Sequence, residues 1–144
     1  MKVSLGSDHR GYKSKEHLKK ILKELNIEYS DEGTLNEESC DYPDFAKRAV
    51  ERVVRAEADF AILICGSGLG MSIAANKFKG IRAALCLNTD MAQMARQHND
   101  ANVLVLSANF IELEEIKNIL NIWLGSDFEG GRHERRVRKI SELE

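Results

Sequence analysis

The sequence predicts a doubly wound α/β fold, in which a five-stranded parallel sheet carries helices on both faces. Segments with strand patterns and helix patterns alternate five times along the 144 residues, with no linker, repeat or low-complexity tract. Such alternation predicts a parallel sheet, because right-handed crossovers place the connecting helices on its two faces. The predicted strands at 60–64 and 102–106 contain continuous apolar runs, as central parallel strands do. We therefore expect one Rossmann-like domain spanning residues 1–144.

Two strands and two helices are expected in the first part of the chain. Residues 2–7 alternate apolar and polar side chains and predict a strand, and a second strand is expected at 27–30. Residues 12–25 place apolar side chains on one face and lysines on the other, which predicts an amphipathic helix. A second helix is expected from Pro43 to Arg55, because proline suits the first helical turn. Its apolar positions are expected to point inward: Phe45, Ala46, Ala49, Val50, Val53 and Val54.

The second part of the chain continues the alternation. We expect strands at 60–64, 81–87 and 102–106, and helices at 71–78, 89–97, 111–124 and about 133–143. Gly80 is expected to end the first of these helices. The last helix is strongly basic, and its Val137 and Ile140 are expected to face the core.

Composition and charge exclude several classes of protein. The chain is 43% hydrophobic and 31% charged with a net charge of −2, so no global charge favours nucleic acid or an anionic membrane. No apolar run approaches the roughly 18 to 20 residues of a membrane span, and the amino-terminal residues lack the pattern of a signal peptide. Three separated cysteines without a CxxC pair argue against a disulfide framework or a structural zinc site and for the cytoplasm. No histidine and carboxylate set has metal-ligand spacing, so no metal is expected.

The stretch Cys65-Gly66-Ser67-Gly68-Leu69-Gly70, here called the glycine loop, is the strongest candidate for an active-site centre. It follows a predicted buried strand and precedes a predicted helix. Its backbone amides and the helix N-terminus can therefore hold an anion beside a thiol. The spacing fits neither the GxGxxG dinucleotide fingerprint nor the GxxxxGK[ST] P-loop. A tight turn without function is the alternative, but three glycines in five residues are more than a turn requires.

Cys65 has the position of a functional thiol, because a helix N-terminus and glycine amides stabilise a thiolate. Such a thiolate could act as a nucleophile or as a general base, and the residues alone leave both open. A buried structural thiol is the alternative for Cys65 and the expected role of Cys40 and Cys86.

Two histidine motifs lie near predicted strand ends. Asp8 and His9 follow the first strand, where a ligand would be within reach, although a solvated loop would look the same. His98, Asn99 and Asp100 precede the fifth strand and so lie at the opposite edge of the sheet from Cys65. If His98 is catalytic, it would act in a neighbouring subunit's site. A histidine interacting with its own helix dipole is the alternative.

The basic tail places Arg132 and Arg136 four residues apart on one helix face. Two arginines on one face can form a bidentate phosphate clamp, for which arginine is better suited than lysine. A solvated basic helix is the plain alternative. A nucleic-acid patch is disfavoured by the acidic balance and the lack of interleaved aromatic residues.

Together these motifs resemble those of type B ribose-5-phosphate isomerases, whose wider family includes galactose-6-phosphate isomerase subunits. The matching stretches span nearly the whole chain in order: 6–9, 41–44, 65–77, 80–83, 98–104, 130–133 and 136–137.

The resemblance implies an aldose–ketose isomerase of the pentose phosphate pathway that needs neither cofactor nor metal. It also implies a homodimer, or a dimer of dimers, with active sites built from both subunits. Cys65 would be the base that moves a proton between C1 and C2 through a cis-enediolate, and the partner's His98 would help to open the sugar ring. The anion hole for the enediolate would comprise Gly66, Ser67, Gly68, Leu69 and Gly70. The sugar would be held by Asp8, Tyr42, Ser67 and Asn99, and the phosphate by His9, Arg132, Arg136 and His133.

Two residues depart from the family pattern. Ser67 stands where the family usually has threonine, and Asn109 stands where several members have an arginine on the phosphate. Asn109 remains a candidate substrate contact, and the phosphate clamp would then consist of Arg132 and Arg136 alone. The leading hypothesis is interconversion of ribose 5-phosphate and ribulose 5-phosphate. The alternatives are isomerisation of allose 6-phosphate or galactose 6-phosphate, and a nucleotide- or anion-binding regulatory module on the same scaffold.

Overall fold

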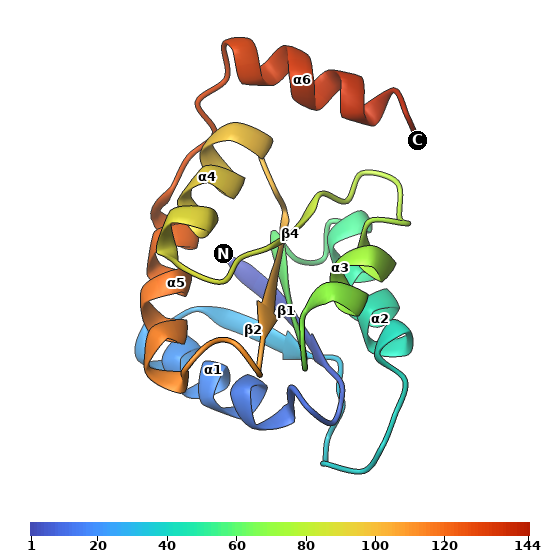
Figure 1. Cartoon of the computed structure of the whole chain (residues 1–144), viewed down its shortest axis with the longest axis vertical. Coiled ribbons are helices and arrows are strands. Elements are labelled where there is room, and N and C mark those ends of the chain that lie inside the picture. Colours follow the sequence, from blue (N-terminus) through green and yellow to red (C-terminus); the bar gives the residue numbers. More distant parts are fainter.

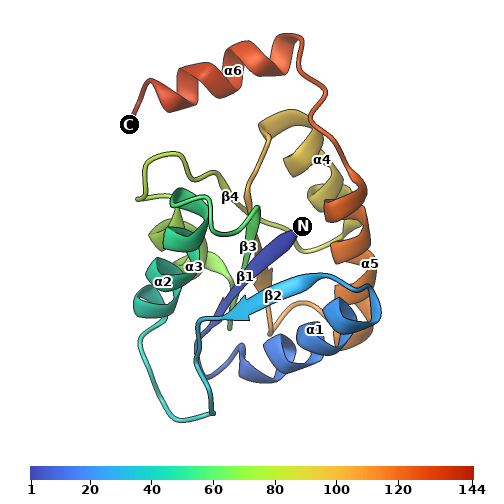
Figure 2. The ribbon, with the colours of Figure 1, turned by 180° about the vertical axis from the view of Figure 1, so that it is seen from behind.

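Five parallel strands form one sheet, in the order β2-β1-β3-β5-β4, in the computed structural model, which describes residues 1–144. The strands are β1 (Lys2–Ser7), β2 (Glu28–Asp31), β3 (Phe60–Cys65), β4 (Ala83–Leu85) and β5 (Val103–Ser107). The helices are α1 (Tyr12–Glu24), α2 (Tyr42–Val54), α3 (Leu69–Ala75), α4 (Thr89–Asn99), α5 (Leu113–Gly125) and α6 (Arg132–Ser141). Helices α2 and α3 cover one face of the sheet, and α1, α4 and α5 cover the other (Figures 1 and 2). The predicted fold class is confirmed.

The central strand β3 supplies both halves of the core. Because successive side chains of a strand point to opposite faces, Ile62 and Ile64 join the cluster under α1, α4 and α5. Ala61, Leu63 and Cys65 join the smaller cluster under α2 and α3. This alternation places the Cys65 side chain on the α2 and α3 side of the sheet, at the carboxyl end of its strand.

The only tryptophan, Trp123 on α5, is fully buried in the larger cluster. Its ring meets the ring of Phe60, the first residue of β3, edge to face at a centroid distance of 6.3 Å. The guanidinium of Arg96 lies 4.9 Å from the Phe60 ring centroid and 5.8 Å from that of Trp123. This aromatic group therefore anchors α4 and α5 to the amino end of β3.

The expected bounds of α3, β4 and α4 need correction. Helix α3 ends at Ala75 and not near Gly80, because the Asn76 side chain pairs with the Ala83 backbone. Its Nδ2 donates to the Ala83 carbonyl at 2.9 Å, and its Oδ1 accepts from the Ala83 amide at 2.8 Å. Strand β4 comprises only Ala83–Leu85, and α4 continues two residues beyond Gln97.

The expected inward positions near two helix ends also need correction. Val54, the last residue of α2, is 54% exposed. Helix α6 packs on α4 beyond the amino ends of the strands and not over the sheet (Figure 1). As a result Ile140 is 43% exposed and Val137 is only half-buried, and His133 is the one buried residue of α6. None of the six helices has the length and apolar character that crossing a bilayer would require.

Candidate active site

Cys65 ends β3 and begins the glycine loop. Its side chain is buried, and its Sγ accepts a hydrogen bond from the Gly68 amide at 3.2 Å. Gly68 has a φ of +81°, a conformation that side-chain-bearing residues rarely adopt. A Cβ at this position would also lie 2.5 Å from Leu85 Cδ1. Glycine at 68 is therefore what allows a backbone N–H to point at the thiol.

The glycine loop is fastened to the segment after β5 through its carbonyl groups. The Gly66 carbonyl accepts hydrogen bonds from Ser107 Oγ at 2.7 Å and from the Asn109 amide at 2.9 Å, and the Cys65 carbonyl accepts one from the Ala108 amide at 2.9 Å. The amides of Gly66, Ser67 and Gly70, in contrast, donate to no acceptor in the chain. Free donors on a fixed backbone beside a thiol form a suitable site for an oxyanion.

Asp8 lies beside Cys65 because β1 and β3 are neighbours and their carboxyl ends meet. It is only 6% exposed, and its amide donates to the Ile64 carbonyl at 3.3 Å. Its Oδ1 accepts hydrogen bonds from the amides of Arg10 and Gly11, each at 3.0 Å. The carboxylate is thus held in place by its own turn.

His9 has a defined pattern of donors and acceptors. Its Nδ1 accepts a hydrogen bond from the Cys40 amide at 3.3 Å, and the Cys40 Sγ lies 3.9 Å from the same nitrogen. Because Nδ1 is the acceptor, a neutral His9 ring carries its proton on Nε2. The ring therefore offers an N–H donor on the side away from Cys40.

Tyr42 and Asn109 both lie at the glycine loop, as a site at the carboxyl edge requires. A Cβ on Gly70 would lie 2.5 Å from Cζ of Tyr42, so the phenol ring packs directly on the loop. A Cβ on Gly66 would lie 3.3 Å from Asn109 Nδ2. The structure thus brings Asp8, Tyr42 and Asn109 together with residues 65–70, and His9 follows Asp8 at the same edge.

Arg10 is a residue at this edge that sequence reasoning missed. Its side chain lies over Gly66, with Cδ 3.0 Å and Nη1 3.7 Å from the position of an added Cβ. The available signal was its place between His9 and Gly11, in a loop already expected to face a ligand.

The remaining predicted residues lie near the amino ends of the strands, opposite the carboxyl ends where Cys65 lies. His98 and Asn99 end α4, and Asn102 just beyond them accepts a hydrogen bond through its carbonyl from the amide of Ala61, near the start of β3. Arg132 and Arg136 are exposed on α6 and form no ion pair in the chain. One chain therefore does not bring these four residues together with Cys65.

His133 connects α6 to α4 at this edge. Its ring stacks on that of His98, with centroids 4.3 Å apart and planes 9° from parallel. Burial lowers the pKa of His133, and positive charge on His98 and Arg132 lowers it further. The Glu129 carboxylate, with Oε2 3.7 Å from Nε2, acts in the opposite direction on this pKa but does not cancel the shift.

The same residues form the one cluster whose donor atoms are close enough to suggest a metal. Ligand atoms of His98, Glu129 and His133 lie within 4.8 Å of one another. A ring nitrogen binds a metal through a lone pair in the ring plane, and stacked parallel rings direct their lone pairs along parallel planes. The arrangement suits ring stacking and does not fit a shared ion.

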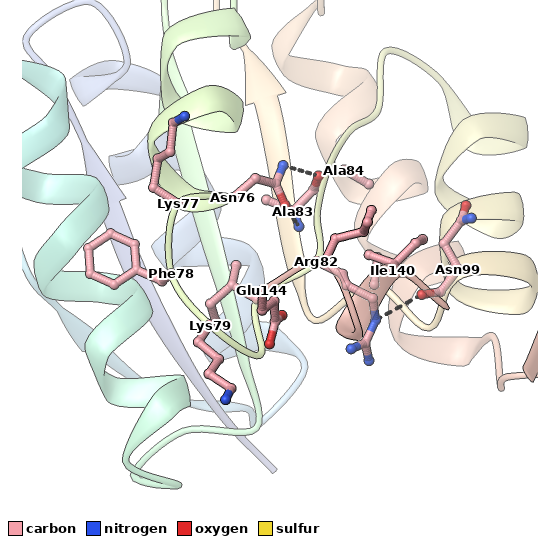
Figure 3. Close-up of a pocket in the computed structure, with 13 residues that line it drawn as sticks. Asn76, Lys77, Phe78, Lys79, Arg82, Ala83, Ala84, Asn99, Ile140 and Glu144 are labelled. Atoms are coloured by element: carbon pink, nitrogen blue, oxygen red, sulfur yellow. Dashed lines mark hydrogen bonds between the residues drawn. The ribbon is translucent and has the colours of Figure 1, made fainter. Parts of the chain in front are cut away.

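A cavity of about 610 Å³ lies between α6 and residues 76–84 and not at the glycine loop (Figure 3). Ile140, Leu143 and Glu144 line it from the carboxyl-terminal side. Arg82 extends toward α4 and donates from Nε to the Asn99 carbonyl at 3.0 Å. The Gly80 amide donates to Glu144 Oε1 at 2.8 Å. This apolar space is separate from the polar groups around Cys65.

Comparison with known proteins gives consistent matches over the whole chain. The sequence model of the family described as Ribose/Galactose Isomerase matches residues 3–140. Ribose-5-phosphate isomerase B of Escherichia coli is 46% identical over 143 residues, covering 99% of this chain and 96% of the relative. Among solved structures, ribose-5-phosphate isomerase B of Clostridium thermocellum is 50% identical with a TM-score of 0.98, covering 99% of this chain and 97% of that one. The corresponding structure from Thermotoga maritima is 54% identical with a TM-score of 0.96, covering 98% and 97%.

Proposed function

The chain belongs to the ribose/galactose isomerase family, and from this we infer that it is an aldose–ketose isomerase that interconverts ribose 5-phosphate and ribulose 5-phosphate. The main structural support for this function is at the glycine loop. There the Gly68 amide donates a hydrogen bond to Cys65 Sγ, and three neighbouring loop amides have no acceptor within the chain.

Cys65 is the proposed base. In the open-chain aldose its thiolate removes the proton from C2, and the electrons of that C–H bond form the cis-enediolate. Delivery of the proton to C1 then gives the ketose, with the hydroxyl proton moving between O1 and O2. The enediolate carries negative charge on its oxygens, and the free amides of Gly66, Ser67 and Gly70 are the donors that stabilise it. Preformed donors of this kind contribute a few kcal/mol each to a transition state.

Asp8, Tyr42 and Ser67 are proposed to hold the sugar hydroxyls around this centre, and Asn109 is proposed as a further substrate contact beside them. These residues come directly after the carboxyl ends of the neighbouring strands β1, β3 and β5 or pack against the glycine loop. A sugar bound among them would lie over Cys65 Sγ. His9 is proposed to donate its Nε2–H to the phosphate.

The other functional residues are proposed to come from a second copy of the chain. His98 would open the ring, Asn99 would contact the sugar, and Arg132, Arg136 and His133 would bind the phosphate. This assignment is supported by their location at the sheet edge opposite Cys65 and by apolar side chains exposed around α6, Ile140 at 43% and Leu143 at 85%. A homodimer with α6 at its interface would complete each site, and two such dimers could associate further.

The cytoplasm is the proposed location. All three cysteines are free, and free thiols persist in a reducing compartment.

The assignment is tested by incubating the protein with ribose 5-phosphate in D2O. We expect ribulose 5-phosphate to form and deuterium to appear at C2 of the remaining aldose. Absence of both would contradict the proposal. Parallel reactions with allose 6-phosphate and galactose 6-phosphate establish the preferred sugar. If either six-carbon sugar phosphate is turned over faster than ribose 5-phosphate, it is the preferred substrate instead. Cys65→Ala should lose nearly all turnover, whereas a regulatory anion-binding module would keep its ligand affinity and show no turnover at all.

A further inference from the structure

The Arg10 side chain lies over Gly66 of the glycine loop. An added Cβ on Gly66 would lie 3.0 Å from Arg10 Cδ, 3.7 Å from Arg10 Nη1 and 3.3 Å from Asn109 Nδ2. The aliphatic part of Arg10 therefore covers Gly66, and Arg10 Nη1 and the side-chain Nδ2 of Asn109 both lie within 4 Å of the same point beside Gly66. Together they place up to seven N–H donors, five on the guanidinium and two on the amide, at one point of the rim.

The turn that carries Arg10 is fixed on both sides. The Asp8 carboxylate accepts the amides of Arg10 and Gly11, each at 3.0 Å. Gly11 lies so close to β3 that an added Cβ would overlap the Ile64 carbonyl oxygen. The backbone of Arg10 is therefore held against the strand that ends in Cys65, and the side chain leaves it in the direction of the glycine loop.

The charge of Arg10 has no partner within the chain. Its guanidinium forms no hydrogen bond and no ion pair, whereas the nearby Lys13 has Nζ 3.5 Å from Glu37 Oε1. The segment facing this rim, residues 31–44, contains six acidic residues and no basic one: Asp31, Glu32, Glu37, Glu38, Asp41 and Asp44. Asp31, Glu32 and Glu37 pair with lysine or arginine side chains, so the uncompensated negative charge of this segment is that of Glu38, Asp41 and Asp44, which Arg10 would partly offset for an entering dianionic substrate.

We propose that Arg10 is a substrate-binding residue whose guanidinium, with the Asn109 amide, binds the phosphate of the sugar phosphate. This inference rests on the proposed function and adds a second phosphate contact at the carboxyl edge, besides that of His9. The phosphate would then be held from two sides, by Arg10 and His9 of one copy and by Arg132 and Arg136 of the other. Arginine suits this position because its planar fork can pair with two phosphate oxygens at once.

The test compares Arg10→Met with Lys13→Met, which removes an exposed cation three residues away, in the first turn of α1. Each variant is assayed for ribose 5-phosphate turnover, and inorganic phosphate binding is measured by calorimetry without any sugar. For Arg10→Met we expect the KM and the phosphate dissociation constant to rise together by about tenfold or more, since a charge-assisted contact is lost, with kcat little changed. Arg10→Lys should recover part of both, and Lys13→Met should change neither.

An unchanged phosphate dissociation constant in Arg10→Met, at an unchanged melting temperature, would overturn the inference. A fall in kcat with unaltered phosphate binding would also overturn it, because it would place Arg10 at the reacting oxygens. Failure of the wild-type protein to isomerise ribose 5-phosphate would contradict the proposed function instead, and the calorimetric comparison would still decide the role of Arg10.

Discussion

His98 and His133 stack face to face at a centroid distance of 4.3 Å, and this contact joins the end of α4 to the start of α6. The stack couples the position of α6 to the protonation of His133. Burial and the charges of His98 and Arg132 lower the pKa of His133, so the folded chain favours the neutral ring.

Because the folded pKa of His133 lies below the unfolded value, its contribution to stability is fully present above about pH 6.5 and declines as pH falls through the folded pKa. We therefore expect the contact between α6 and α4 to weaken on acidification. The Cε1–H resonance of His133 should titrate at lower pH in the folded protein than in urea. His133→Phe, which keeps a flat ring, should remove this part of the pH dependence, and titration at higher pH in the folded protein would contradict the explanation.

Replacing Cys65 should affect chemistry, whereas replacing Cys86 should affect stability. Loss of the proposed base in Cys65→Ala is expected to reduce kcat by about 10² to 10⁴ with the fold retained. Burial raises the pKa of the Cys86 thiol to about 12, so this cysteine remains protonated and unreactive. Cys86→Ala should keep its turnover and lose roughly 1 kcal/mol of unfolding free energy. Initial rates and urea unfolding of both variants measure the contrast, and an active Cys65→Ala would exclude Cys65 as the base.

Alanine at position 68 should damage both the loop and the activity. A residue with a Cβ is strained at a φ of +81°, at a cost of about 1–3 kcal/mol, and its Cβ would also collide with Leu85. Displacement of the loop removes the N–H that points at Cys65, so kcat should fall more than about tenfold. Gly125→Ala is the matched control, because a Cβ there meets nothing within 4 Å, and alanine should be neutral or stabilising. Equal kcat values for the two variants would contradict the role of the Gly68 amide.

Mixed dimers test whether a site contains residues of two copies. Cys65→Ala and His98→Ala proteins should each be inactive alone. After subunit exchange, half of the dimers should be mixed with one intact site each, giving about one quarter of wild-type activity. Exchange can be followed with differently tagged chains. If the tags exchange and activity stays at zero, His98 does not act across an interface.

The fully buried Lys15 should make Asp31 necessary for stability. Lys15 Nζ lies 2.6 Å from Asp31 Oδ1, and Lys19 Nζ lies 2.9 Å from Asp31 Oδ2. Burial alone would raise the pKa of Asp31, but hydrogen bonds from both lysines outweigh it and lower this pKa. This stabilisation is therefore present at neutral pH and is lost as pH falls below the ordinary carboxyl range.

Asp31→Asn removes the closest counterion of the buried Lys15 charge and leaves only Glu16, whose Oε1 lies 3.8 Å from Nζ. This loss should cost about 3–5 kcal/mol of unfolding free energy. The same chemical change at the exposed pair of Glu24 and Lys117, Glu24→Gln, should leave the unfolding free energy nearly unchanged, because solvent screens this pair. Chemical denaturation at pH 7 compares them. If both variants lose similar amounts of unfolding free energy, burial of Lys15 does not make its ion pair more important for stability than an exposed one.

The order of strands and helices could be predicted because it depends on local apolar patterns, which residues 60–64 and 103–106 display clearly. The end of α3 could not, since it depends on Asn76 reaching the Ala83 backbone, a contact between segments. The apolar side of α6 was recognised, but a helical pattern does not reveal which surface covers it. The location of Arg10 over Gly66 required the pairing of β1 with β3, so residue type and loop position alone did not single it out.

The buried Trp123 is an intrinsic fluorescent probe whose emission depends on one region of the protein. Trp123 is the only tryptophan, and it contacts Phe60 at the start of β3, whereas Cys65 lies at the other end of that strand. Arg96, which lies over both rings, is two residues from His98. Indole emission should therefore respond to rearrangement of α4 and α6 and to global unfolding, and be insensitive to events at the glycine loop. Tryptophan fluorescence of the unmodified protein should therefore report on rearrangements near the amino end of β3 and not on substrate binding at the glycine loop.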